Sequence, residues 1–139
     1  MRFTGFFTSK RGTEWNYHFY NIGWVEMWHG TTERITGGWR IGRDVFSPNV
    51  TKECYQAIEE MFGFRKNPDH ENEVIIPDMS HDELIEKIEC KYGCSATISK
   101  TTEGSFRMIK FTSGGDACRI KTFDSFDSAK AFVLTNMVH

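Results

Sequence analysis

Two histidines in the first part of the chain, His18 and His29, lie close in sequence to the acids Glu14 and Glu26. An imidazole beside a carboxylate can act as a general acid or base near neutral pH, because the carboxylate orients the ring that moves the proton. Such a pair would suit a small hydrolase or ribonuclease. We rank this function third and assign no catalytic residue, because half-buried histidines are the commoner case.

Cys90 and Cys94 form a second group that could do chemistry. With Cys118 and His81 they could supply the ligands of a structural zinc ion. Zinc-binding cysteines usually flank a turn and occur as two such pairs, whereas here Gly93 stands between the cysteines at a predicted helix end. We also expect no export signal, and so no need for disulfides. The sequence therefore predicts free thiols, no metal and no cofactor.

Aromatic and basic side chains suggest nucleic-acid or nucleotide binding as the second candidate function. Residues 15–20 alternate rings with polar side chains, and rings on an open sheet can stack on bases. The same alternation also builds the core side of a sheet, so the location of the rings stays open. Basic residues on two later strands share one alternation and could face a DNA groove. The residues assigned to this site are Trp39, Arg40, Arg43, Arg107, Arg119 and Lys121.

The acidic middle of the chain favours a protein partner as the first candidate function. Residues 51–92 carry 11 acidic against five basic side chains, whereas residues 1–50 and 93–139 each carry six basic against four acidic. Such a segment could bind a basic surface of another protein. We therefore expect a non-catalytic interaction or inhibitor module, a class that includes phage-encoded inhibitors of host or defence machinery. The acids assigned to partner binding are Glu53, Glu59, Glu60, Asp82, Glu86 and Glu89.

The positions of these residues depend on the elements that the hydrophobic pattern predicts. In the first half, apolar residues alternate along two strands, the alternation slips at Gly23, and Gly63 ends an amphipathic helix. These elements are strands over residues 3–8 and 15–20, a third strand after Gly23, a hairpin at Gly37 and Gly38, and a helix over residues 51–62.

The second half reads as helix, three short strands, helix. Ser80 and Glu83 form a capping box that predicts a helix over residues 80–92, and Gly93 would end it. Asp124 or Ser125 would cap the final helix, whose inward face is apolar. The expected strands cover Ala96 and Ile98, residues 106–111, and Cys118 with Ile120.

Residues 122–132, which follow three predicted strands, resemble the end of the plant ethylene-response-factor DNA-binding domain. The order helix, three strands, helix also resembles a double-stranded-RNA-binding domain. Both resemblances would imply nucleic-acid binding. We interpret both as shared architecture. The strands lack the tryptophan and arginine pattern of the first family, and Asp124 and Asp127 stand where the second has the paired lysines that grip phosphates.

Length and composition set the overall expectation. With 139 residues, 39% of them hydrophobic, the chain can form a single domain with its own core. It contains no apolar run of about 18 residues, so we expect a soluble cytoplasmic protein with no membrane partner. The predicted fold is α+β: an N-terminal antiparallel sheet, a helix, a loop and a C-terminal α-β-β-β-α unit. Subdomains over residues 1–64 and 74–139, joined by the polar loop 65–73, would lie within this domain.

Overall fold

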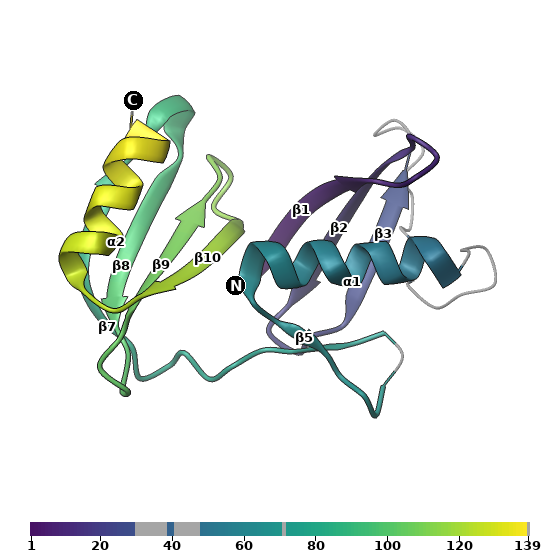
Figure 1. Cartoon of the computed structure of the whole chain (residues 1–139), viewed down its shortest axis with the longest axis horizontal. Helices are drawn as coiled ribbons and strands as arrows, with labels where there is room; N and C mark the ends of the chain where they lie inside the picture. Colours follow the sequence, from purple (N-terminus) through teal and green to yellow (C-terminus); the bar gives the residue numbers. More distant parts are fainter. Residues whose placement is uncertain (30–38, 41–47, 71, 139) are drawn as a thin grey trace. The chain divides into compact units, whose positions relative to one another are not determined.

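The computed structural model describes residues 1–29, 39–40, 48–70 and 72–138, and the side chains of residues 29, 39–40 and 48–50 are outside the description. The chain divides into two compact units, unit 1 (Met1–Ile76) and unit 2 (Pro77–His139). Each unit combines a β-sheet with a helix (Figure 1), so the predicted α+β class is confirmed. The predicted hairpin glycines, Gly37 and Gly38, lie outside the described residues.

Unit 1 consists of a meandering antiparallel sheet, a long helix and a short hairpin. Its elements are β1 (Arg2–Thr8), β2 (Glu14–Tyr20), β3 (Val25–His29), β4 (Trp39–Arg40), α1 (Pro48–Phe62), β5 (Arg65–Lys66) and β6 (Val74–Ile75). The sheet strands follow the order β4-β3-β2-β1, and α1 lies across one face of this sheet (Figure 1). β5 pairs with β6 beyond the end of the helix.

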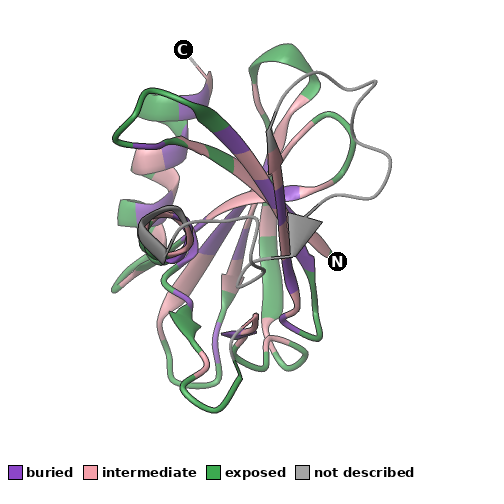
Figure 2. Ribbon diagram, turned by 90° about the vertical axis from the view of Figure 1, so that its right-hand side faces the viewer, coloured by how far each residue is buried: buried purple, intermediate pink, exposed green. Residues whose placement is uncertain are grey.

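The core of unit 1 lies between the sheet and α1 and is largely aromatic. The register pairs Phe3 of β1 with Phe19 of β2, and the two buried rings stack with centroids 4.9 Å apart. The ring edges of Phe62 and Phe64 meet Phe3 at centroid distances of 5.5 and 5.4 Å. Buried and exposed positions alternate along the strands (Figure 2), as expected for a sheet with one covered face.

Gly23 forms the turn that resets the alternation between β2 and β3, as the sequence predicts. Its φ of +85° is one that side-chain-bearing residues rarely adopt, and its N–H donates to the Tyr20 carbonyl at 2.8 Å. A Cβ at this position would lie 2.3 Å from the carbonyl oxygen of Val74, whose N–H donates to the Gly23 carbonyl. A glycine is therefore required for β6 to pack against this turn.

Unit 2 is an antiparallel sheet in the order β10-β9-β8-β7 with a C-terminal helix on one face. Its elements are β7 (Glu83–Glu89), the 3-10 turn η2 (Lys91–Gly93), β8 (Ser95–Lys100), β9 (Phe106–Phe111), β10 (Ala117–Phe123), α2 (Phe126–Val133) and the π-helical turn η3 (Leu134–Val138). The core includes Ala96, Ile98 and Met108 from the sheet with Ala129 and Val133 from α2. The three predicted strands of this unit are confirmed.

The predicted helix over residues 80–92 is wrong, because this segment forms strand β7. Ser80 does not cap a helix: its N–H and hydroxyl both donate to Asp78. Leu84 and Ile85 stay exposed on this strand, so the apolar spacing that also fits a helix forms no buried stripe. A register shift lies between Leu84 and Glu86. The backbone pairing of β7 with β8 outweighs local helix propensity, which amounts to only tenths of a kcal/mol per residue (up to about 0.7). The C-terminal unit is therefore β-β-β-β-α, which removes the element order behind the double-stranded-RNA-binding resemblance.

The final helix forms as predicted. Ser125 is extended at the N-cap, and its Oγ accepts the N–H of Ser128 at 3.1 Å. Ala129, Val133 and Met137 are buried against the sheet. The predicted cap and inward face of this helix are therefore confirmed.

The polar stretch 65–73 lies inside unit 1 rather than between the units. Asn67 donates its N–H to the Glu73 carbonyl at 2.8 Å within the β5–β6 hairpin, and the chain enters unit 2 between Ile76 and Pro77. The predicted single domain over residues 1–139 stays a prediction. Among the described residues, no helix combines the length and apolar character needed to cross a membrane.

Candidate binding surfaces

Three of the predicted partner-binding acids, Glu53, Glu59 and Glu60, come together in unit 1. They line an open groove of about 660 Å³ between α1 and the end of β1. We call this feature the acidic groove. Its lining residues are Phe7, Thr8, Lys10, Glu53, Gln56, Ala57, Glu59 and Glu60.

The helical period of α1 positions the acidic groove. Glu53, Gln56 and Glu60 follow an i, i+3, i+7 spacing on one side of the helix. Cys54 and Ile58 lie fully buried on the opposite side, so the carboxylates are directed away from the core. The side chains of Phe7 and Ala57 give the groove an apolar component, which a purely solvated acidic helix face would lack.

The charge of the acidic groove is only weakly compensated. Glu53 accepts the backbone N–H of Lys10 at 3.3 Å, a contact that brings no countercharge from that backbone. Within the described part of the chain, no ion pair holds the carboxylate of Glu59 or Glu60, and Lys10 is the basic residue of the lining. The groove therefore has net negative charge and can accept a cationic group.

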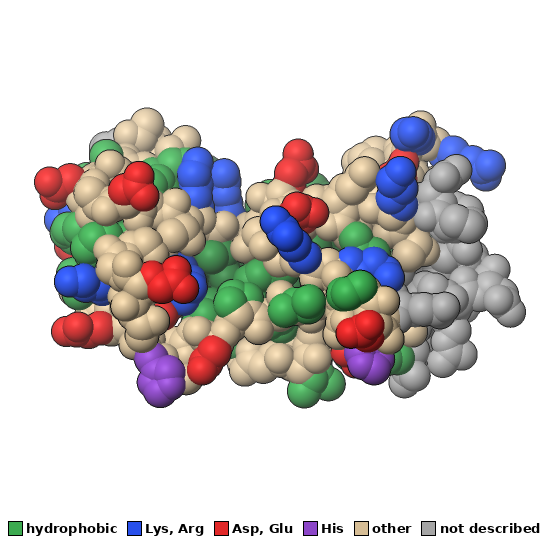
Figure 3. Space-filling model, turned by 60° about the horizontal axis from the view of Figure 1, so that its bottom comes forward, with side chains coloured by type: hydrophobic (Ala, Val, Ile, Leu, Met, Phe, Trp, Pro, Cys, Tyr) green, Lys and Arg blue, Asp and Glu red, His purple; other side chains and the backbone are tan. Residues whose placement is uncertain are grey.

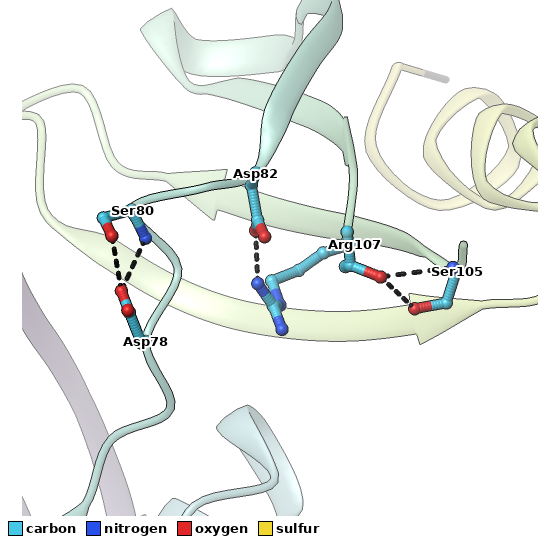
Figure 4. Close-up of polar contacts among 6 residues, drawn as sticks. Asp78, Ser80, Asp82, Ser105 and Arg107 are labelled. Carbon is cyan, nitrogen blue, oxygen red and sulfur yellow. Dashed lines mark hydrogen bonds and ion pairs between the residues drawn. The ribbon is translucent and has the colours of Figure 1, made fainter. Parts of the chain in front are cut away.

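The other three predicted partner-binding acids lie in unit 2, and each already has a cation. Asp82 is bound by Arg107, and the two side chains point toward one another in Figure 4. Glu86 accepts Lys130 Nζ at 3.2 Å. Glu89 Oε1 lies 3.8 Å from Lys87 Nζ. The carboxylates of Asp82 and Glu86 are therefore less available to a partner than those of the acidic groove, whereas the exposed carboxylate of Glu89 is only weakly held.

The predicted basic face of Arg107, Arg119 and Lys121 does not exist as one surface. The register places Thr122 of β10 opposite Arg107, so Arg119 and Lys121 project from the other face of the sheet. There Arg119 Cζ lies 5.0 Å and Lys121 Nζ 4.8 Å from the ring centroid of Phe132 in α2. The error arose because equal parity within each strand does not fix the register between strands.

The remaining residues of the predicted nucleic-acid site are only partly described. Trp39 and Arg40 form β4, which pairs with Met27 and Glu26 of β3. Their side chains, and the whole of Arg43, lie outside the described residues. On the face drawn in Figure 3, acidic and basic side chains are interspersed and do not gather by sign.

The aromatic residues of β2 separate between the two faces of the sheet. Trp15, Tyr17 and Phe19 are buried on the α1 side. The opposite side carries the aromatic face, which we define by Phe6, His18, Tyr20 and Trp28. The ring centroid of His18 lies 5.0 Å from that of Trp28 and 6.0 Å from that of Tyr20. Phe6 is 67% exposed and Tyr20 50%, so both rings are accessible to a ligand.

The aromatic face also contains the histidine–carboxylate pair that the sequence suggested. His18 Nε2 lies 3.0 Å from Glu26 Oε2, with side chains 20% and 29% exposed. His18 Nδ1 is buried and has no hydrogen-bond partner among the described residues. Nε2 of His18 is therefore already bonded to Glu26, and Nδ1 is closed off from solvent. The side chain of His29 lies outside the described residues.

The thiols are free and do not form a metal site in the described residues. Cys54 is fully buried, whereas Cys90, Cys94 and Cys118 are half-buried. Burial raises the pKa of the Cys54, Cys90 and Cys118 thiols, and the Lys110 ammonium partly opposes this effect on the latter two. Across the described ranges, no group of three or more His, Cys, Asp or Glu side chains could hold a metal ion. The predicted alternative of a zinc site with His81 therefore has no assembled ligand set.

Comparison with known proteins gives no family assignment. No family model, no curated protein and no solved structure matches this chain.

Proposed function

We propose that this protein is a non-catalytic binding protein whose acidic groove takes a basic segment of another protein. The observation that carries the proposal is the convergence of Glu53, Glu59 and Glu60 in one open groove beside an apolar lining. A lysine- or arginine-rich segment would bring both an aliphatic stem for Phe7 and Ala57 and a charge for the carboxylates. An inhibitor that blocks a basic surface of its target would use the same chemistry.

The complementary charge also sets the expected kinetics of such a complex. Carboxylates at the rim of an interface accelerate encounter and make the affinity depend on ionic strength. Exposed ion pairs contribute roughly 0.2–1 kcal/mol each, so reversing two charges should weaken binding by about tenfold or more.

The test compares capture of proteins from nuclease-treated lysate by three forms of the full chain. The groove variant is Glu59→Lys with Glu60→Lys, and the control is Glu83→Lys with Glu103→Lys, two exposed acids of unit 2. We expect wild type and control to retain the same stoichiometric protein, which fades at high salt, and the groove variant to lose it. Equal loss by groove variant and control would contradict the proposed site. Retention of the captured protein by all three forms would also contradict the proposed site.

A second candidate function is base stacking on the aromatic face. The specific observation is that Phe6 and Tyr20 are exposed on the side of the sheet that α1 does not cover, where the His18 ring lies near those of Tyr20 and Trp28. Stacking on such rings contributes roughly 1–3 kcal/mol per base and tolerates any base. This site replaces the basic face of unit 2 as the location of the nucleic-acid alternative.

The second candidate is tested by quenching of tryptophan fluorescence with single-stranded oligothymidine. Tyr20→Ala should weaken binding roughly tenfold, as expected for the loss of one stacked base. Tyr92→Ala, which removes a 91% exposed ring from unit 2, is the matched control and should bind like wild type. Absence of quenching at low salt, or an equal effect of both variants, would exclude this function.

A further inference from the structure

Cys90 and Cys94 face each other across the tip of the β7–β8 hairpin. Cys90 donates its N–H to the Cys94 carbonyl at 3.0 Å, immediately beyond the Glu89–Ser95 pair that ends the ladder. The turn between them contains Tyr92 and Gly93 at φ of +61° and +75°. The turn thus holds the two cysteines opposite each other, one residue beyond the facing ends of β7 and β8.

The two thiols also project to the same side of the hairpin. Ile88 pairs with Ala96, and both pack in the core beneath α2. Cys90 and Cys94 each lie two residues further toward the tip, so their side chains return to that same side. Opposite residues of antiparallel strands have Cα atoms about 4.5–5.5 Å apart, which is within the range that a disulfide spans.

A small cavity adjoins this pair of thiols. Its volume is about 250 Å³. We call it the thiol cavity, and its lining combines both cysteines with two lysines and a carboxamide. The lining residues are Cys90, Lys91, Tyr92, Cys94, Lys110, Asn136 and Met137. The lysine ammonium groups favour an anionic ligand beside the sulfur atoms.

We propose that Cys90 and Cys94 form a redox-active dithiol that exchanges with an anionic low-molecular-weight disulfide, of the glutathione disulfide class, at the thiol cavity. The cavity supplies the cations that the carboxylates of such a disulfide require. This inference concerns unit 2 and does not depend on the proposed function of the acidic groove.

The exchange proceeds in two balanced steps. The Cys94 thiolate, having lost its proton to solvent, attacks one sulfur of the disulfide, forming a mixed disulfide and expelling one thiolate. Cys90 then loses its proton and attacks the Cys94 sulfur, closing the protein disulfide and expelling the second thiolate. The two protein thiols are oxidised by two electrons, and the small disulfide is reduced to two thiols.

The resolving role of Cys90 follows from its surroundings. Its Sγ donates to the Ile88 carbonyl at 3.6 Å, and burial raises the pKa of this thiol. Both effects hold the proton on Cys90 until Cys94, directly opposite, carries an electrophilic sulfur. Cys118, half-buried near Cys94 and Lys110, is the competing thiol, and Cys54 is buried in unit 1.

The principal experiment treats the reduced full chain with glutathione disulfide, followed by acid quench, alkylation and peptide mass mapping. We expect a product lighter by two hydrogen atoms, with the bond between Cys90 and Cys94. The variant Cys90→Ser should stop at a glutathione adduct on Cys94, whereas Cys118→Ser should behave like wild type. A wild-type product that bonds Cys118, keeps glutathione as a stable adduct, or leaves Cys90 and Cys94 reduced would overturn the proposal.

A second measurement tests the cationic cavity separately from the thiols. Lys110→Gln should slow the reaction with glutathione disulfide roughly two- to fivefold, the effect of one partly screened charge. The same substitution should slow the reaction with uncharged hydroxyethyl disulfide less, because there only the effect of Lys110 on the pKa of Cys90 is lost. Equal slowing with both reagents would overturn the assignment of the cavity as an anionic-disulfide site.

Discussion

The guanidinium of Arg107 on β9 binds the carboxylate of Asp82, which immediately precedes β7, and the two side chains are only 15% and 12% exposed. The sequence assigned Arg107 to nucleic acid and Asp82 to a protein partner. In the folded chain each residue neutralises the other. The pair therefore ties the start of the outermost strand to the sheet and removes one residue from each candidate site.

The first prediction concerns this pair. Arg107→Ala leaves a mostly buried carboxylate without its cation and should lower the free energy of unfolding by about 1–3 kcal/mol. The double variant with Asp82→Ala should recover part of this loss, which a double-mutant cycle in urea would measure. The exposed pair Lys87 and Glu89 is the control and should couple by less than about 0.5 kcal/mol. Strictly additive effects at Asp82 and Arg107 would show that the contact contributes nothing.

A second prediction concerns Gly23. Gly23→Ala places a Cβ 2.3 Å from the Val74 carbonyl oxygen at a left-handed φ. It should lower the free energy of unfolding by about 2–4 kcal/mol. Gly115 has a similar φ of +89°, but a Cβ there would meet open space. Gly115→Ala should therefore lower the free energy of unfolding by only about 1 kcal/mol. Chemical denaturation of both variants separates the steric effect from the backbone effect. Equal losses would mean that β6 moves away from the turn without cost.

The third prediction concerns the cap of α2. Ser125→Ala removes the acceptor of the Ser128 N–H and should lower the free energy of unfolding by about 1 kcal/mol. Ser113→Ala, at an exposed turn position, should change it by less than about 0.5 kcal/mol. Thermal melts followed by circular dichroism would show the difference. A Ser125 variant as stable as wild type would contradict the cap.

The fourth prediction uses the turn before β7, shown in Figure 4. The Ser80 hydroxyl and N–H donate to Asp78 Oδ1 at 2.6 and 2.9 Å and lower the pKa of this carboxyl. The stabilising contribution of the pair is therefore present above the unfolded-state pKa and is lost as the pH falls through the lower folded-state value.

Ser80→Ala removes the stronger of these two hydrogen bonds and should move the pKa of Asp78 upward, toward its ordinary value. Carboxyl carbon chemical shifts followed through an acid titration measure this directly. Ser99→Ala is a serine control on β8, away from Asp78, and should leave the titration unchanged. An unshifted midpoint in the Ser80 variant would mean that the turn does not persist in solution.

Local patterns were sufficient for much of the chain. The alternation of Trp15, Tyr17 and Phe19 predicted a strand whose apolar side is the core, and Ser125 predicted the start of α2. They failed at residues 80–92, where a capping box and an apolar spacing fit a helix but the β8 edge was available for pairing. A short amphipathic segment with both periods takes the structure that its non-local partner allows.

The candidate sites divide in the same way. The sequence by itself determined the acidic character of residues 51–62, the aromatic content of β2 and the spacing of Cys90 and Cys94, because these are properties of composition and local period. Only the tertiary structure decided which of them remain available. It brought Phe7 beside Glu53, Glu59 and Glu60, separated Arg107 from Arg119 and Lys121, and paired Asp82 and Glu86 with distant cations. Register and long-range packing set these relationships, and neither is encoded within a single stretch of chain.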